Sequence, residues 1–286
     1  MTRAGTAERP RIFGILNVTP DSFSDGGNFF SVRDAVARAM QLLADGADVI
    51  DVGGESTRPG ASAVPAEEEM RRVIPVISEI ASSAHARISI DTVKAEVARA
   101  ALDAGATMIN DVSGMRLDPD MATLAAESKC EVILMHSRGS VAEMATYDFA
   151  TYGNDPVGEI LGELTTRVHA VEKLGVNRSC ITIDPGIGFS KRSEHSALVL
   201  KEIHRFVETG YPVCLGVSRK RVVAEMVARE SGTARDPKSV SNDERDRKTV
   251  ELNVAAFKSG VTSFRVHDVK ANRAALDAAW IAAKDQ

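Results

Sequence analysis

Eight short apolar runs that alternate with helical patterns constrain the fold of this chain more than any other feature. The runs are RIFGILN, ADVIDVGG, RISID, TMIND, CEVILMH, CITIDPG, PVCLGVS and VTSFRVH, ending at Asn17, Gly54, Asp91, Asp111, His136, Gly186, Ser218 and His267. Continuously apolar strands that alternate with helices are typical of a parallel sheet covered on its faces. Eight such units in 286 residues predict a (β/α)₈ TIM barrel rather than an open doubly wound sheet.

The segments between the runs carry helix signals. Residues 31–46 place Ala35, Ala39, Leu42 and Leu43 on one stripe, and Gly46 is suited to end the helix. After a helix expected from about Arg219 to Arg229, residues 230–250 are rich in Gly, Pro, Ser and charge. This stretch is predicted to be a solvated loop on the outside of the barrel.

Composition favours one soluble domain. Hydrophobic residues make up 44% and charged residues 26%, which is ordinary for a globular protein. We expect residues 1–10 to be a flexible N-terminal extension and residues 11–286 to be a single barrel domain. A net charge of −5 argues against a general nucleic-acid surface, so a few local cations must hold any anionic ligand.

Membrane and redox signals point to the cytoplasm. No apolar run approaches the length of a membrane span, and the first ten residues lack the apolar core of a signal peptide. Cys130, Cys180 and Cys214 lie far apart without metal-ligand spacing, and we expect all three to be reduced and buried. A cytoplasmic protein that binds no membrane is the expectation.

Two turns are longer than the two to six residues or so that usually join a strand to a helix. One follows Asn17 and contains Gly26 and Gly27, and the other runs from Gly53 to Gly60. Overlong, glycine-flanked loops at the carboxyl ends of strands predict a moving cover over an active site.

Polar residues at the ends of three runs suit a nitrogen heterocycle. Asp91, Asn110 and Asp184 would point into one barrel mouth, offering acceptors and an amide to an amino-oxo-pyrimidine edge. After Asp184, glycines let the backbone approach a ligand, and Phe189 can lie against a flat ring. For Asp111, a structural capping role and a place on the rim stay equally open.

The last two runs suggest an anion site. Ser218 and Lys220 lead directly into a helix, whose free amides favour an anion. Arg265 and His267 occupy alternate positions of the last run and so point the same way. Phosphate commonly binds after strands seven and eight of such barrels, although a buried structural Arg–His pair is the alternative. His136 stays open between packing and the rim.

Several strings together resemble the motifs of the dihydropteroate synthase family. They are FGILNVTPDSFSDGG, DVGGESTRPGA, ISIDT, INDVSG, LMH, DPGIGF, GVSRK and FRVHDV, in order from Ile12 to Val269. The resemblance implies a pterin-binding (β/α)₈ barrel, a homodimer and a sulfonamide target. It also implies condensation of 4-aminobenzoate with 6-hydroxymethyl-7,8-dihydropterin diphosphate, with magnesium as cofactor and release of diphosphate.

The resemblance also assigns residues by matching position. Asn17 is implied as the magnesium contact, and the catalytic set as Asn17, Lys220, Arg265 and His267. The implied pterin contacts are Asp91, Asn110, Met135, Asp184, Lys220 and Arg265. The implied diphosphate contacts are Asn17, Arg265 and His267. The implied aminobenzoate contacts are Thr57, Pro59, Phe189 and Ser218.

The chain departs from the family pattern at several points. Met115 and Arg116 stand where smaller residues are usual, Ser190 where glycine is common, and HSRGSVAEM follows the fifth run in place of a Met-Gln-Gly string. The segment from Val222 to Lys248 is also longer than expected. Two rival readings are a pterin-binding methyltransferase barrel acting on a corrinoid and a catalytically silent pterin-binding paralogue.

Overall fold

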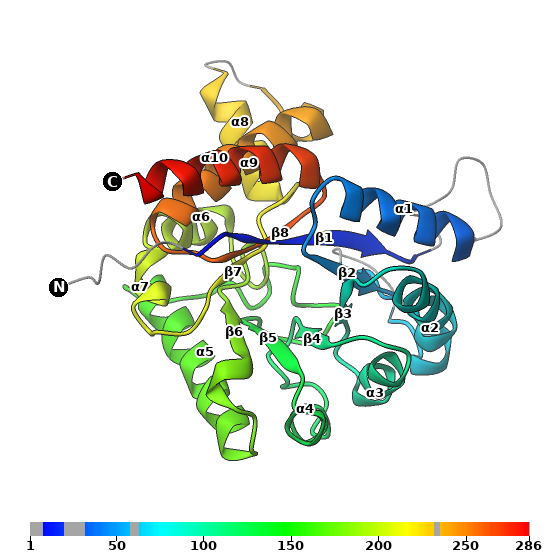
Figure 1. Cartoon of the computed structure of the whole chain (residues 1–286). Helices are drawn as coiled ribbons and strands as arrows, with labels where there is room; N and C mark the ends of the chain where they lie inside the picture. The colour runs from blue at the N-terminus through cyan, green and yellow to red at the C-terminus, as the bar shows by residue number, and fades with distance from the viewer. Residues whose placement is uncertain (1–7, 20–31, 58–62, 232–234, 286) are drawn as a thin grey trace.

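A closed ring of eight parallel strands forms the centre of the molecule. The computed structural model describes residues 8–19, 32–57, 63–231 and 235–285 (Figure 1). The strands are β1 (Arg11–Asn17), β2 (Val49–Gly53), β3 (Arg87–Asp91), β4 (Met108–Asp111), β5 (Glu131–Met135), β6 (Ile181–Asp184), β7 (Cys214–Leu215) and β8 (Ser263–Val266). Their order is β6-β5-β4-β3-β2-β1-β8-β7, and a parallel bridge between Ile183 and Val213 joins the two ends. The predicted (β/α)₈ barrel is confirmed.

Helices surround the ring of strands (Figure 1). They are α1 (Val32–Ala44), α2 (Ala66–Ser83), α3 (Ala95–Asp103), α4 (Met121–Ser128), α5 (Pro156–Lys173), α6 (Ser193–Lys201), α7 (His204–Val207), α8 (Arg221–Glu230), α9 (Asn242–Lys258) and α10 (Val269–Lys284). Short 3-10 turns occur at Arg178–Cys180 and Pro237–Ser239. The stripe predicted for α1 faces the core, since Ala35, Ala39 and Leu42 are buried and Leu43 is partly buried against them, and Gly46 follows the helix with a φ of 101°.

The barrel interior has an apolar floor and a polar mouth. Phe13, Val49, Met108, Ile133 and Cys214 form a buried cluster inside the ring. Alternate residues of a strand face the same side, so the inward positions two residues further along β2, β4 and β5 lie above this floor. They are Asp51, Asn110 and Met135. Two of these three positions, on β2 and β4, are polar, so the interior gains hydrogen-bonding groups at the depth where a ligand enters.

The loop predicted for residues 230–250 is wrong in its second half, where α9 begins at Asn242. The Ser241 hydroxyl accepts from the Glu244 backbone N–H, and the Glu244 carboxylate accepts from the Ser241 N–H, which forms a capping box. Asp246 on the same helix pairs with Arg219, with 2.7 Å between Nη2 and Oδ2. The capping box and this partly buried ion pair stabilise a helix that the charge-rich composition did not indicate.

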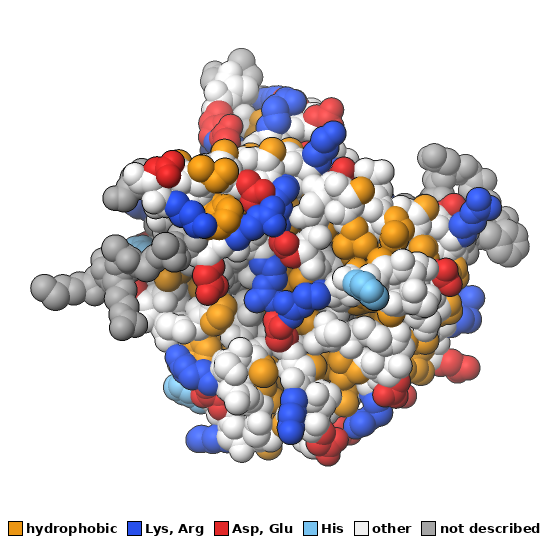
Figure 2. Space-filling view, in the orientation of Figure 1, with side chains coloured by type: hydrophobic (Ala, Val, Ile, Leu, Met, Phe, Trp, Pro, Cys, Tyr) orange, Lys and Arg blue, Asp and Glu red, His pale blue; other side chains and the backbone are white. Residues whose placement is uncertain are grey.

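Other expectations hold in part. The cysteines are free, but Cys180 is only half-buried. Among the described residues, no helix is long and apolar enough to cross a membrane. On the face drawn in Figure 2, Lys and Arg side chains are interspersed with Asp and Glu. Three predicted segments lie partly outside the described part of the chain. They are the proposed extension at residues 1–7, the first predicted cover at residues 20–31, and residues 58–62 of the second, which include Pro59.

Candidate active site

A charged network spans the barrel mouth between β2, β3, β4 and β8. The Arg265 guanidinium donates to Asp51 through Nε and to Asp91 through Nη2, the second bond being 2.7 Å long. Asn110 Nδ2 donates to Asp51 Oδ2 over 3.1 Å. Predicted residues from three different strands thus share one hydrogen-bonded cluster, and Asp51, which is completely buried, joins them.

Asp51 is the site residue that the sequence reading missed. Asp51 lies inside the run ADVIDVGG, whereas site residues were expected at the ends of the runs. The available signal was a carboxylate in an otherwise apolar strand, because a buried Asp is rare unless it is paired. Two arms of the network, Arg265 and Asn110, supply that pairing.

Burial and neighbouring charge set the protonation of this cluster. Burial raises the pKa of Asp91 to about 7, while the Arg265 charge opposes the shift and the Asp51 charge adds to it. Burial would lower the pKa of Arg265, but Asp51 and Asp91 together hold it above its ordinary value. Arg265 therefore stays cationic, and its charge favours the carboxylate form of Asp91 against the effect of burial.

A second cluster comes from the β6–α6 and β7–α8 loops. Lys220 Nζ donates to the Ile187 carbonyl and lies 4.3 Å from the centroid of the Phe189 ring. Burial lowers the pKa of Lys220 to about 8, with the Asp184 charge opposing the shift. Burial also raises the pKa of Asp184, while Lys220 and a bond from the Gly186 N–H lower it.

Gly216 shows that the two clusters share one mouth. A β-carbon added there would lie 3.6 Å from Asp184 Oδ2, 3.9 Å from Lys220 Nζ and 3.9 Å from the Arg265 β-carbon. Asp184, Lys220 and the stem of Arg265 thus all approach the glycine that follows β7. Gly186 is constrained more strictly, because its φ is 70° and a β-carbon would lie 2.0 Å from the His136 carbonyl oxygen.

Ser218 and His267 form a third group beside the start of α8. Ser218 Oγ lies 2.9 Å from His267 Nδ1 and accepts from the His267 backbone N–H over 3.2 Å. The α8 N-cap, Lys220, provides no side-chain cap hydrogen bond to the first turn. Residues expected to serve different substrates, aminobenzoate and diphosphate, therefore lie in direct contact.

The remaining predicted residues lie around this mouth or outside the described chain. Asn17 ends β1 beside Gly53, is half-buried, and its side chain has no hydrogen-bond partner among the described residues. Thr57, in the β2–α2 loop, is half-buried and is the last described residue before residues 58–62. Met135 is buried, with Phe189 packed against its cluster. Pro59 is not among the described residues.

Asp111 and His136 have structural contacts. Asp111 Oδ1 accepts from the Ser113 N–H and hydroxyl, both over 2.7 Å, which favours the local capping role. His136 is 4% exposed and lies 3.1 Å from Glu163 Oε2 and 2.8 Å from Lys191 Nζ. Burial lowers the pKa of His136 to about 4, with the Lys191 charge adding to the shift, so its ring is neutral and packed.

Known proteins resemble this chain over nearly its full length. The family described as pterin binding enzyme matches residues 13–267. A dihydropteroate synthase of Mycobacterium leprae is 41% identical over 278 residues, covering 96% of this chain and 95% of that protein. The structure of Xanthomonas albilineans dihydropteroate synthase with 4-aminobenzoic acid has a TM-score of 0.86 at 41% identity, covering 98% and 94% of the two chains. A structure of the same organism's enzyme with 7,8-dihydropteroate gives 0.83 at 38% identity, covering 98% and 95%.

Proposed function

The chain belongs to the dihydropteroate synthase family, and on that basis we propose the reaction that its barrel mouth performs. It condenses 4-aminobenzoate with 6-hydroxymethyl-7,8-dihydropterin diphosphate to give 7,8-dihydropteroate and diphosphate. The enzyme is therefore a transferase of a pterin-methylene group. The observation that carries the proposal is the joining of Asp91, Asn110 and Arg265 in one network at the mouth, with Asp184 and Lys220 beside it.

The pterin binds where carboxylates and an amide face a donor-rich ring edge. The Asp184 carboxylate accepts hydrogen bonds from the pyrimidine edge of the pterin, and the Asn110 side-chain amide donates to and accepts from the same edge. Lys220 donates to the ring oxygen, and Met135 packs against the ring. The Arg265 guanidinium is held by Asp51 and Asp91, and this fixed plane is suited to stack on the pterin. Buried donors and acceptors that are already oriented reduce the reorganisation that binding requires.

The reaction needs no protein nucleophile. The bond between the methylene carbon and the diphosphate oxygen breaks, and its electron pair leaves with diphosphate. The resulting cation is delocalised over the dihydropterin, and the Asp91 and Asp184 carboxylates stabilise it. The amine nitrogen of aminobenzoate then forms the new C–N bond with its lone pair and loses a proton to solvent. Orientation of the two substrates supplies much of the remaining rate enhancement.

Arg265, His267 and Asn17 are proposed to hold the diphosphate. Among the described residues, no group of three His, Cys, Asp or Glu side chains could hold a metal ion alone. Magnesium commonly keeps several waters and binds through substrate phosphates and one or two protein oxygens. The unpartnered amide of Asn17 fits that mode. Bound there with diphosphate, magnesium would stabilise the charge of the leaving group.

Aminobenzoate is proposed to enter beside Phe189, with its carboxylate at Ser218 and the start of α8. The uncapped amides of α8 and the cationic Lys220 support this orientation. Thr57 and Pro59 on the β2–α2 loop complete the proposed contacts. A homodimer and a cytoplasmic location are further proposals supported by the family, and native mass measurement tests the first of them.

Product analysis tests the proposed function. Purified protein, magnesium, pterin diphosphate and 4-aminobenzoate should yield a product with the mass of 7,8-dihydropteroate. A parallel incubation with methyltetrahydrofolate and a corrinoid should yield no methyl transfer. Binding of the pterin without any condensation product would instead favour the silent paralogue.

A further inference from the structure

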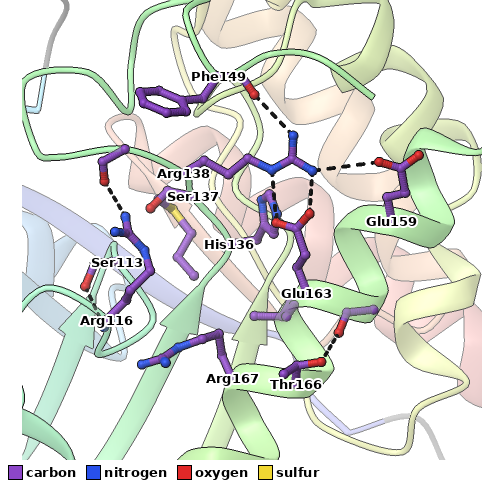
Figure 3. Close-up of a pocket in the computed structure, with 14 residues that line it drawn as sticks. Ser113, Arg116, His136, Ser137, Arg138, Phe149, Glu159, Glu163, Thr166 and Arg167 are labelled. Atoms are coloured by element: carbon purple, nitrogen blue, oxygen red, sulfur yellow. Dashed lines mark hydrogen bonds and ion pairs between the residues drawn. The ribbon is translucent and has the colours of Figure 1, made fainter. Parts of the chain in front are cut away.

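A cavity of about 740 Å³ lies outside the strand ring, between the β4–α4 loop, the segment after β5, and α5 (Figure 3). Its volume is in the range of small-molecule sites. It shares Met135 with the barrel mouth, but Asp91, Asn110, Asp184, Lys220 and Arg265 do not line it. The cavity is therefore a separate space beside the proposed active site.

Three arginines line this cavity, and their charges are balanced unequally. Arg138 is neutralised by Glu163, with 3.0 Å between Arg138 Nε and Glu163 Oε2. Neither Arg116 nor Arg167 has a carboxylate partner among the described residues. Figure 3 shows Arg116 and Arg167 on the left of the cavity, with Glu159 on the right.

Backbone carbonyls orient these two arginines, and the buried Asp111 carboxylate interacts with both charges without forming an ion pair with either. Arg167 Nη2 donates to the Met115 carbonyl over 2.6 Å, and its Nε donates to the Gly114 carbonyl. Arg116 Nη2 donates to the Gly139 carbonyl. Partial burial and the nearby Arg167 charge lower the pKa of Arg116, while the Asp111 charge opposes the shift. An oxyanion placed between the two would form charge-assisted bonds and relieve their repulsion.

The rest of the lining is suited to an apolar body. Phe149, Leu164 and Met135 contribute hydrocarbon surface, and Ser113, Ser137 and Thr166 contribute hydroxyls. From these contacts we propose that the cavity binds a small organic anion. Its carboxylate or phosphate lies between Arg116 and Arg167, and its apolar part lies against Phe149 and Leu164.

Several of the positions at which this chain departs from the family pattern line this cavity or lie behind its wall. Arg116 and the Ser137–Gly139 stretch line it directly. Ser190 supports the wall from behind, because its hydroxyl accepts from the Arg138 N–H over 2.8 Å and donates to the Arg138 carbonyl over 2.9 Å. The reaction proposed at the mouth uses none of these residues. The proposed condensation thus leaves this space without a role.

Binding is tested by NMR titration of the labelled protein with phenyl phosphate and with phenylacetate, using benzyl alcohol as the uncharged control. We expect both anions, or one of them, to shift the backbone amides of Gly139, Gly162 and Thr166 saturably. The stronger of the two identifies the preferred head group. Arg116→Gln and Arg167→Gln should each weaken binding at least tenfold, whereas Arg99→Gln, on exposed α3, should leave it unchanged.

Gly162→Leu provides a test that does not depend on removing a cation. A β-carbon at Gly162 meets no atom within 4 Å, so the larger side chain should enter the cavity without disturbing the fold. This variant should lose the anion-induced shifts while retaining condensation activity. The proposal is overturned if no cavity amide shifts, if benzyl alcohol binds as well as the anions, or if wild type and the arginine variants bind alike.

Discussion

At the scale of single residues, burial determines what each polar group at the mouth can do. Asp91, Asn110 and Asp184 were predictable because each follows an apolar run and faces the carboxyl end of the sheet. Asp51 was missed because it lies inside an apolar run, although a carboxylate in such a strand was itself a signal. The ends of the last two strands were expected to form one anion site, but direct contact between Ser218 and His267 was not expected, because the two residues were assigned to different substrates.

Lys220 gives a prediction of pH dependence. Its pKa is lowered to about 8, so it loses its proton as the pH rises through that value. If the charged form binds the pterin, kcat/KM should fall above about pH 8. In Lys220→Arg the cation persists, so this alkaline fall should move out of the accessible range even if the maximal rate is lower. If kcat/KM fell at the same alkaline pH in the wild-type and Lys220→Arg enzymes, the titrating group would be one other than Lys220.

Ser190 gives a prediction of stability. It is completely buried at a φ of 48°, a region that side chains rarely adopt, and its hydroxyl bonds both backbone groups of Arg138. Ser190→Ala keeps the strain and loses the bonds, so it should cost about 1–3 kcal/mol of unfolding free energy. Ser190→Gly should cost less, because it relieves roughly 1 kcal/mol of strain. Urea denaturation compares them, and a less stable glycine variant would contradict this account.

At the scale of elements, buried charges fix the loop after β2. Lys94 Nζ contacts Glu55 Oε2 at 2.8 Å and Glu69 Oε2 at 2.6 Å, and Glu55 Oε1 accepts from the Val64 N–H. Glu69 is fully buried, and burial raises its pKa while Lys94 opposes the shift. Gly54 packs so close to α2 that an added β-carbon would lie 2.7 Å from Val73. The start of this loop is thus anchored, while its role as a moving cover stays a prediction.

Glu55→Ala tests whether this anchor positions the aminobenzoate contacts. Because Thr57 is two residues further on, releasing Glu55 should raise the KM for aminobenzoate about tenfold, the effect of losing about 1.4 kcal/mol of binding. Affinity for pterin diphosphate should change less than twofold, since its proposed contacts lie on other strands. Glu67→Ala, an exposed residue of α2, is the control. Equal losses for both substrates would assign Glu55 to the fold instead.

At the scale of the whole molecule, alternation of strand and helix was enough to predict the barrel. The way in which the ring closes was not indicated by the sequence. The strand β7 has only two residues and pairs with β6 through a single bridge. The wrong loop between residues 230 and 250 has a similar origin. Its charges indicated solvent, whereas Asp246 reaches Arg219 across the α8–α9 contact. Composition indicates only the local preference of a segment for helix or loop, and tertiary ion pairs can override that preference.

We expect the magnesium site to be completed only when the protein and the diphosphate of the substrate are both present. Excess chelator should abolish condensation, and added magnesium should restore it. Asn17→Ala should weaken magnesium-dependent diphosphate binding, measured by calorimetry, with an unchanged melting temperature. Full activity in chelator would contradict the metal assignment.

The central claim is that condensation takes place at the mouth built around Asp184 and Lys220. The direct measurement is the rate of diphosphate release with both substrates in wild type, Asp184→Asn and Asp111→Asn. Asp111 is a matched control, since it is also a buried strand-end carboxylate but bonds only its own turn. We predict release matched one-to-one by dihydropteroate, a loss of about 10²–10³ in Asp184→Asn, and near wild-type rates in Asp111→Asn. Equal rates in Asp184→Asn and wild type would contradict the account.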